Sequence, residues 1–152
     1  MEEERRLTVK LHRFLHDGWP HEHPSPSEKG YPQVFDLMSH WVLFYDSIPI
    51  GYTGSLDMGH FHFVGNTFIL PEYRQSGWHS YLLSVRNANL GLRPKITVLN
   101  PIDGTHMANL VKVVTKLGYF PITCYEDVKD VMSEKLYHEV RNENQQMWRL
   151  NA

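Results

Sequence analysis

The middle of the chain consists of apolar, strand-like runs separated by short polar turns. Val34 to Tyr45 is strongly apolar and aromatic, and Ile48 to Leu56 follows the turn residues Asp46-Ser47. The turn Asp57-Met58-Gly59 precedes His60 to Leu70, which is rich in Phe, Val, Thr and Ile. β-Branched and aromatic residues favour strands, whereas Asp, Ser and Gly favour tight turns. The pattern predicts three consecutive antiparallel strands.

Beyond Pro71 the apolar positions recur with the period of a helix. Four apolar or small residues share one helical face: Tyr81, Leu82, Val85 and Ala88. This spacing predicts a helix from Ser76 to Leu90, which Gly91 ends. Lys95 to Leu99 is short and β-branched, and it predicts a further strand.

The part of the chain after Leu99 predicts two more helices and two more strands. Met107 to Leu117 predicts a helix that Gly118 ends, and Val128 to Val140 predicts another. The remaining predicted strands are Tyr119 to Tyr125 and Gln146 to Leu150.

The N-terminal region predicts a helix and a loop. Leucine and phenylalanine recur at helical spacing among charged residues, which predicts a short amphipathic helix over Glu3 to Asp17. Pro20 to Pro32 is dense in Pro, Ser, His and Gly, and predicts a loop.

The order of these elements predicts an α/β fold with a mixed, mostly antiparallel twisted sheet and helices on both faces. The chain has 152 residues, of which 41% are hydrophobic and 21% charged, as in ordinary globular proteins. We therefore expect a single domain over residues 1–152.

Composition excludes several classes of protein. The single cysteine, Cys124, rules out an internal disulfide and a multi-cysteine metal cage, and it favours a reducing compartment. No run approaches the ~18 apolar residues that a membrane span needs, and the acidic start is unlike a signal peptide. A net charge of −2 gives no positive field to attract nucleic acid. We expect a cytoplasmic protein that does not bind a membrane, and composition does not favour nucleic acid as a partner.

The junction between the strand ending at Leu70 and the following helix carries the candidate chemistry. The first turn of a helix exposes unpaired amide N–H groups and the positive end of the helix dipole, which suits a pyrophosphate. Gly77 lets the backbone approach an anion closely, and Arg74 adds a charged hydrogen-bond donor.

At these residues the chain resembles the GNAT superfamily of acyltransferases. The signature of that family is Arg or Gln, two further residues, Gly, one residue, and Gly or Ala, after a strand and a turn similar to Pro-Glu-Tyr. Arg74 and Gly77 match the first two fixed places, while His79 occupies the third, where it can crowd the cofactor or bind a phosphate. Lys116-Leu117-Gly118-Tyr119 resembles the family's Lys-Leu-Gly-Phe. The resemblance covers roughly residues 41–123.

This resemblance implies a GNAT-like fold, acetyl-CoA as cosubstrate, and direct attack of a primary amine on the thioester. The amine belongs to a small molecule or a protein. The strand ending at Leu70 would diverge from the neighbouring strand, Lys95 to Leu99. The pantetheine arm would lie in the gap between the two strands, and the pyrophosphate would lie on the amides of residues 75–80. The implied cofactor-binding residues are Phe68, Ile69, Leu70, Arg74, Gln75, Ser76, Gly77, Trp78, His79, Ser80 and Asn109.

The catalytic groups are less well matched to the family. Where its members often carry a tyrosine acid, four residues before Gly118, this chain has Val114, which has no proton to offer. The family's asparagine in that helix falls at Met107, with Asn100 and Asn109 nearby. His60 and His62 are the candidate catalytic bases, because imidazole titrates near neutrality and residues two apart in a strand share a face. The alternative is that one histidine packs in the core and the other is solvated.

The histidines near the start raise the question of a metal. His12 and His16 share a face of the predicted helix, and His21 and His23 follow. Four imidazoles without a cysteine or a well-placed carboxylate are more typical of a solvated surface, so we expect no metal.

The sequence leaves three functions open: an active N-acetyltransferase, a catalytically inactive relative that binds coenzyme A or another protein, and acyl transfer in a nucleic-acid pathway. The net charge of −2 disfavours the third. Pairing is common among such proteins, so a homodimer is one possible state.

Overall fold

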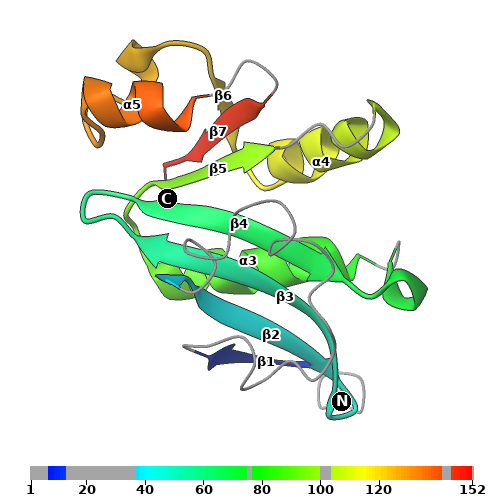
Figure 1. Cartoon of the computed structure of the whole chain (residues 1–152). Helices are drawn as coiled ribbons and strands as arrows, with labels where there is room; N and C mark the ends of the chain where they lie inside the picture. The colour runs from blue at the N-terminus through cyan, green and yellow to red at the C-terminus, as the bar shows by residue number, and fades with distance from the viewer. Residues whose placement is uncertain (1–6, 13–36, 75–76, 100–103, 142–144, 152) are drawn as a thin grey trace. The chain divides into compact units, whose positions relative to one another are not determined.

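The structure is a computed structural model of the chain, and it describes residues 7–12, 37–74, 77–99, 104–141 and 145–151. The chain groups into two compact units. Unit 1 comprises residues 1–56 and 65–89, and unit 2 comprises residues 57–64 and 90–152. The described strands follow the order β1-β2-β3-β4-β5-β7-β6 in a seven-stranded sheet (Figure 1). Strand β4, His62–Ile69, contributes to both units.

Unit 1 contains the antiparallel strands. These are β1 (Leu7–His12), β2 (Ser39–Tyr45), β3 (Ile48–Asp57) and the second half of β4. Asp46 and Ser47 have φ of 49° and 67° between β2 and β3. Two successive positive φ values are typical of a type I′ hairpin turn, whose twist matches that of the strands. The predicted turn and both flanking strands are confirmed over the described residues.

The strand β1 corrects the prediction of a helix over Glu3 to Asp17. Residues 7–12 are extended and pair antiparallel with β2, with Leu7 opposite Tyr45 and His12 opposite His40. Leu7 and Val9 are half-buried and Thr8 and Lys10 are exposed, so residues 7–10 alternate with the period of a strand, whereas Leu11 is exposed. The helical spacing of leucines misled the prediction because sheet pairing supplies partners for the backbone. The rest of that segment and the predicted loop lie outside the described residues.

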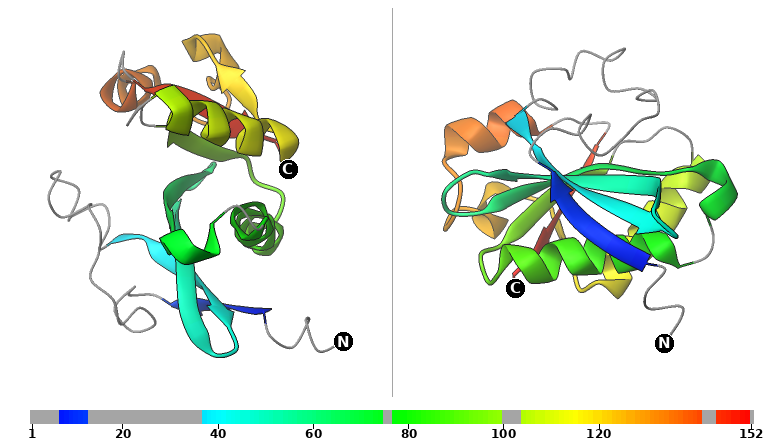
Figure 2. Two further views of the ribbon diagram at one scale, coloured as in Figure 1. Left: turned by 90° about the vertical axis from the view of Figure 1, so that its right-hand side faces the viewer. Right: turned by 90° about the horizontal axis from the view of Figure 1, so that it is seen from below.

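Helix α3, Trp78–Leu90, belongs to unit 1 and confirms the predicted helix over its described part. Arg86 is buried and its Nη1 donates to Oγ1 of Thr53 at 2.7 Å. The Oγ1 atom of Thr53 also lies 2.7 Å from Oγ1 of Thr67 on β4, within hydrogen-bond distance. These side chains place α3 against one face of the antiparallel strands (Figure 2).

The other face of these strands carries a small apolar cluster. Its members are Val42, Phe44, Tyr52, Phe68 and Leu70. Successive strand residues point to opposite faces, which separates this set from Thr53 and Thr67. Gly51 lets β3 approach β4 closely, because a Cβ there would lie 2.8 Å from the backbone oxygen of Phe68.

Unit 2 is a smaller sheet with a helix on each face. Strand β5 (Lys95–Leu99) pairs parallel with residues 62–64 of β4 and antiparallel with β7 (Gln146–Leu150), which pairs with β6 (Phe120–Ile122). Helix α4 (Gly104–Lys116) covers one face through Val114 and Trp148. Helix α5 (Glu134–Val140) covers the other through Tyr137 and Met147 (Figure 1). The predicted mixed sheet with helices on its faces is confirmed.

The end of α4 matches its prediction closely. Gly118 has φ +95°, and its N–H donates to the carbonyl of Thr115 at 3.1 Å. The N–H of Tyr119 donates to the carbonyl of Val114 at 3.0 Å. This pair of bonds is a Schellman motif, which favours glycine at the left-handed position.

Two predicted elements in unit 2 are shorter in the structure. The strand expected over Tyr119 to Tyr125 is confined to β6, and a 3-10 helix η4 (Tyr125–Asp127) follows it. The helix expected from Val128 begins only at Glu134, where Ser133 accepts a hydrogen bond from the N–H of Leu136.

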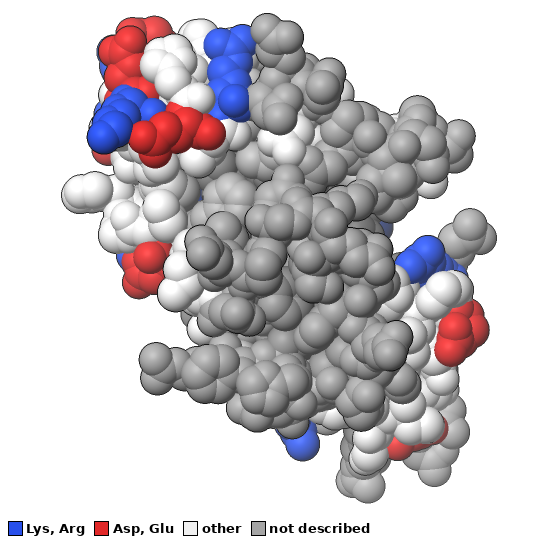
Figure 3. All heavy atoms as spheres, in the orientation of Figure 1, with Lys and Arg blue, Asp and Glu red and all other residues white. Residues whose placement is uncertain are grey.

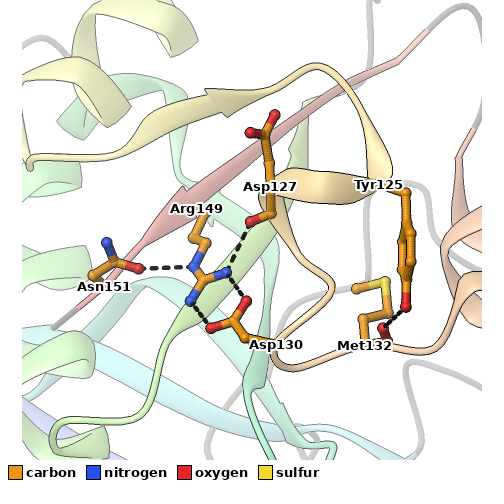
Figure 4. A network of polar contacts seen from close by, with 6 residues as sticks. All are labelled: Tyr125, Asp127, Asp130, Met132, Arg149 and Asn151. Carbon is orange, nitrogen blue, oxygen red and sulfur yellow. Dashed lines mark hydrogen bonds and ion pairs between the residues drawn. The ribbon is translucent and has the colours of Figure 1, made fainter.

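Buried Arg149 explains why the segment before α5 is not helical (Figure 4). Its guanidinium donates to both carboxylate oxygens of Asp130 at 2.7 Å and to the backbone oxygen of Asp127 at 2.8 Å. Its Nε donates to Asn151 at 2.7 Å. An arginine on β7 therefore fixes this segment in an irregular path, which local spacing cannot reveal.

Candidate functional site

The strand-to-helix junction of unit 1 holds the candidate site. Strand β4 ends at Ile69, the 3-10 helix η3 (Pro71–Tyr73) follows, and α3 begins at Trp78. Arg74 leaves this turn with an exposed side chain. Its Nε donates to the backbone oxygen of Ile69 at 2.7 Å, and its guanidinium carbon lies 5.2 Å from the centre of the Phe68 ring. The guanidinium is thus anchored at one edge and presents its remaining donors outward.

Gly77 supplies the backbone turn that starts α3. Its φ is +78°, a left-handed conformation that side chains other than glycine rarely adopt, and a Cβ there would meet nothing within 4 Å. Tyr81 donates the first backbone hydrogen bond of the helix, to the carbonyl of Gly77 at 3.1 Å. The amides just before Tyr81 therefore precede the helical ladder, where an anion finds donors and the positive end of the dipole.

Three aromatic rings hold this junction together. The indole of Trp78 stacks on Tyr45 with centroids 5.1 Å apart and on Tyr73 with centroids 5.5 Å apart. The two tyrosine rings lie 6.3 Å from each other. Because the rings come from β2, η3 and α3, they fix the start of the helix relative to the strands.

The structure brings most of the predicted cofactor-binding residues to this one junction. Ile69 is buried and Leu70 half-buried, and the N–H of Leu70 donates to the carbonyl of Ile50 at 2.8 Å. His79 and Ser80 lie half-buried in the first turn of α3. Gln75 and Ser76 lie outside the described residues. Asn109 is exposed on α4 in unit 2.

The two histidines proposed as bases occupy different environments in unit 2. His60 is exposed in the turn before β4, so the expectation that it shares a strand face with His62 is wrong. His62 is 5% exposed, and its Nε2 is buried without a hydrogen-bond partner among the described residues. Burial lowers the pKa of His62, and the nearby charge of Arg93 lowers this pKa further. The imidazole is therefore neutral at neutral pH.

The environment of His62 contains both charge signs. Asp57 and Arg93 form a bidentate ion pair with N–O distances of 2.8 Å and 3.0 Å. The hydrogen bond from Arg93 holds the pKa of Asp57 well below its ordinary value. Lys95, opposite His62 in the parallel ladder, is fully buried and donates from Nζ to the carbonyl of Gly91.

No proton donor stands where the family's tyrosine would be. Val114 is 4% exposed and packs in the apolar cluster of α4 with Leu99, Tyr119 and Trp148. Its isopropyl group therefore serves packing.

Sequence reasoning missed a buried polar pair in unit 1. His40 on β2 has no exposed surface, and its Nε2 lies 2.9 Å from Nδ2 of Asn66 on β4. Asn66 has φ +55° within the strand. The dipeptide Gly65-Asn66 inside an otherwise strand-like run is the signal that could have indicated it, because these residues tolerate the left-handed conformation typical of β-bulges.

Surface charge and metal-binding groups add little to the site. Basic and acidic side chains lie close to one another on the described part of the face in Figure 3. Within the described ranges, no three His, Cys, Asp or Glu side chains gather as metal ligands. His16, His21 and His23 fall outside those ranges. The described helices are also too short or too polar to cross a bilayer.

Comparison with solved structures defines the class of fold. The chain has the fold of the GNAT acetyltransferases, as the resemblance at Arg74 and Gly77 predicts. No protein-family model matches the sequence, and comparison with curated proteins gives no significant match.

Three solved structures illustrate the similarity. An IAA acetyltransferase from Bacillus cereus is 14% identical with a TM-score of 0.66, over 96% of this chain and 99% of that one. A GNAT family acetyltransferase from Elizabethkingia anophelis with acetyl-CoA bound is 13% identical with a TM-score of 0.66, over 97% and 99%. A Bacillus subtilis acetyltransferase in complex with CoA is 11% identical with a TM-score of 0.63, over 96% and 99%. At these identities the likeness establishes the fold.

Proposed function

We propose that this protein is an N-acetyltransferase that transfers an acetyl group from acetyl-CoA to a primary amine of a small molecule or protein. The observation that carries the proposal is the junction at Arg74 and Gly77. An anchored guanidinium stands beside a helix start whose first amides precede the helical ladder. Two neighbours of the same fold are described with acetyl-CoA or CoA bound.

In this proposal the diphosphate of the cosubstrate lies at the start of α3. The amides of residues 77–80 and the free edge of Arg74 would donate to its oxygens. His79 occupies a place where the family signature has Gly or Ala. Because its side chain is half-buried in the first turn, we propose that it donates to a phosphate oxygen.

The pantetheine arm would then follow β4 back from the junction. Backbone groups near Phe68, Ile69 and Leu70 are the candidates to hold it, because these residues lie at the end of β4, just before the junction. A reducing compartment, which the single cysteine favours, suits a thiol product, and we propose the cytoplasm.

A direct test measures binding and chemistry separately. Acetyl-CoA should raise the melting temperature of the wild-type protein, and an Arg74→Glu variant should lose that shift while keeping its own melting temperature, because Arg74 is exposed. Lys116→Glu is a matched control, as it reverses an exposed charge on α4. An unchanged wild-type melting temperature at millimolar acetyl-CoA would refute the proposal.

The second candidate function is an inactive relative that binds coenzyme A or a partner protein. The observation that favours it is Val114, which packs in the core where an acid is common in the family. Thiol release from acetyl-CoA with a panel of polyamines, amino sugars and peptide amines separates the two candidates. Binding without thiol release above the buffer rate would support the inactive relative.

A further inference from the structure

The buried pair of His40 and Asn66 has the chemistry of a proton acceptor with its own positioning group. The Nδ2 of Asn66 donates to Nε2 of His40 at 2.9 Å, so the neutral imidazole carries its proton on Nδ1. The imidazole also lies edge-on to the ring of Tyr52, with centroids 5.7 Å apart. Burial raises the pKa of the Tyr52 phenol, which is therefore protonated at neutral pH.

The surrounding backbone is shaped to admit this imidazole. A Cβ at Gly54 would lie 3.2 Å from Nε2 of His40 and 3.2 Å from the carbonyl oxygen of Gly65. The same Cβ would lie 2.7 Å from Cε of Met38, so glycine at this position leaves space for both the Met38 side chain and the imidazole. Burying a polar group lowers stability unless the group is hydrogen-bonded, and the Asn66 amide supplies that bond to Nε2 of His40.

Asn66 adds an unusual backbone conformation to the same place. Its φ of +55° is left-handed, a conformation that asparagine adopts more readily than other residues with a side chain. It lies two residues beyond Val64, the last residue of β4 in the parallel register with β5. Left-handed residues inside strands are typical of β-bulges, which are over-represented at sheet edges and next to active sites.

The length of the cosubstrate connects this pair to the proposed reaction, so this step rests on the proposed function. The pantetheine arm has about twelve main-chain bonds from the diphosphate to the sulfur, equal to about four extended residues or ~14 Å. Asn66 precedes Leu70 by four residues, or ~13 Å of strand. An arm that enters β4 beside Leu70 and follows the strand would therefore end level with Asn66. His62 precedes Asn66 by four more residues.

We propose that His40 is the general base of the acyl transfer and that Asn66 positions the acceptor amine. Asn66 is half-buried whereas His40 is fully buried, so the ammonium group of the acceptor reaches the pair from the side of Asn66. There it replaces the amide nitrogen of Asn66 as the donor to Nε2 of His40. The amide oxygen of Asn66 accepts a second N–H of the same ammonium. His40 removes one proton; the amine nitrogen then bonds to the acyl carbon as the C–S bond breaks. A second nitrogen proton goes to the thiolate, and His40 releases its proton to water.

Imidazole NMR tests the placement without knowledge of the acceptor. In protein labelled with ¹⁵N-histidine, CoA should shift the His40 signals, whereas ADP, which has the diphosphate and no arm, should leave them in place. The signals are assigned by their loss in His40→Gln. If CoA raises the melting temperature but does not shift the His40 signals, the role of His40 as base is refuted and the proposed function stands. If CoA does not bind at all, both fail.

Kinetics then separate the two roles. His40→Gln should lower kcat by about 10²–10⁴-fold while CoA binding persists, and exposed His138→Gln is the control that should change neither. Asn66→Gly keeps the left-handed backbone and should chiefly raise KM, so it remains informative if His40→Gln does not fold. Wild-type rates in both His40→Gln and Asn66→Gly would overturn the proposal.

The pH dependence of the transfer rate shows which neighbouring group acts as the base. The titratable described residues that face His40 are His12, opposite it on β1, and Tyr52 on β3. The wild-type rate should rise with pH, and this rise should vanish in His40→Gln and persist in His12→Gln. Loss of the rise in His12→Gln alone would assign the base to His12 and overturn the role of His40.

Discussion

Helix α3 provides a matched pair of glycine substitutions that separates stability from binding. Gly77 before the helix has φ +78°, and Gly91 after it has φ +79°. A Cβ at either position would meet nothing within 4 Å, so alanine causes no clash. The remaining cost is the left-handed conformation, about 1–2 kcal/mol for a residue with a Cβ. For a chain of this size that cost corresponds to a melting temperature lower by about 2–8 °C.

Only Gly77→Ala should also weaken binding of CoA. The alanine relieves its strain by rotating the backbone at the start of α3, which turns the first amides of the helix away from the diphosphate. Losing one or two charge-assisted hydrogen bonds, at about 1.5–3 kcal/mol each, lowers affinity by roughly 10-fold or more. Gly91→Ala should bind CoA as the wild type does.

Differential scanning fluorimetry and isothermal titration calorimetry measure the two effects on the same samples. Equal CoA affinity in both variants, together with equal losses of stability, would refute the assignment of the diphosphate to the Gly77 end of α3. A larger affinity loss in Gly91→Ala would refute it more directly.

Three further predictions concern individual side chains. Arg74→Met should weaken CoA binding about 10-fold by calorimetry, with little effect on urea unfolding, because the side chain is exposed. Arg149→Met should lower the free energy of unfolding by about 2–3 kcal/mol, because buried Arg149 holds Asp130 and the backbone of Asp127; unchanged urea unfolding would contradict this. The pKa of His62 is lowered from 6.5, so the unfolded chain takes up its proton first and stability falls as pH drops below 6.5. His62→Gln should flatten that dependence in urea unfolding measured at several pH values, and an unchanged slope would contradict it.

Elements with strong local signals could be predicted from the sequence. The strands Lys95–Leu99 and Gln146–Leu150 have the predicted bounds, because each is a short apolar run between turn-forming or polar residues. Gly118 ends α4 as expected, since a Schellman motif needs a left-handed residue. These features depend on neighbours in sequence.

Elements set by tertiary contacts could not be predicted. The segment Leu7–His12 becomes a strand because β2 supplies its hydrogen-bond partners. The residues before α5 are irregular because Arg149, distant in sequence, holds them. His60 falls in a turn because β4 starts only at His62, and strand ends are poorly marked by composition.

The candidate site divides in the same way. The junction at Arg74 and Gly77 is local in sequence, so its strand, turn and helix start could be recognised. The pair of His40 and Asn66 joins residues 26 positions apart. Its existence depends on the register of the sheet and on the space at Gly54, neither of which a single sequence specifies.

An amide NMR titration with CoA tests the central claim most directly. The account predicts saturable shifts that are largest for the amides of residues 77–80, with a smaller response when ADP replaces CoA. Saturable shifts confined to residues away from this junction, or no shifts at millimolar CoA, would contradict it.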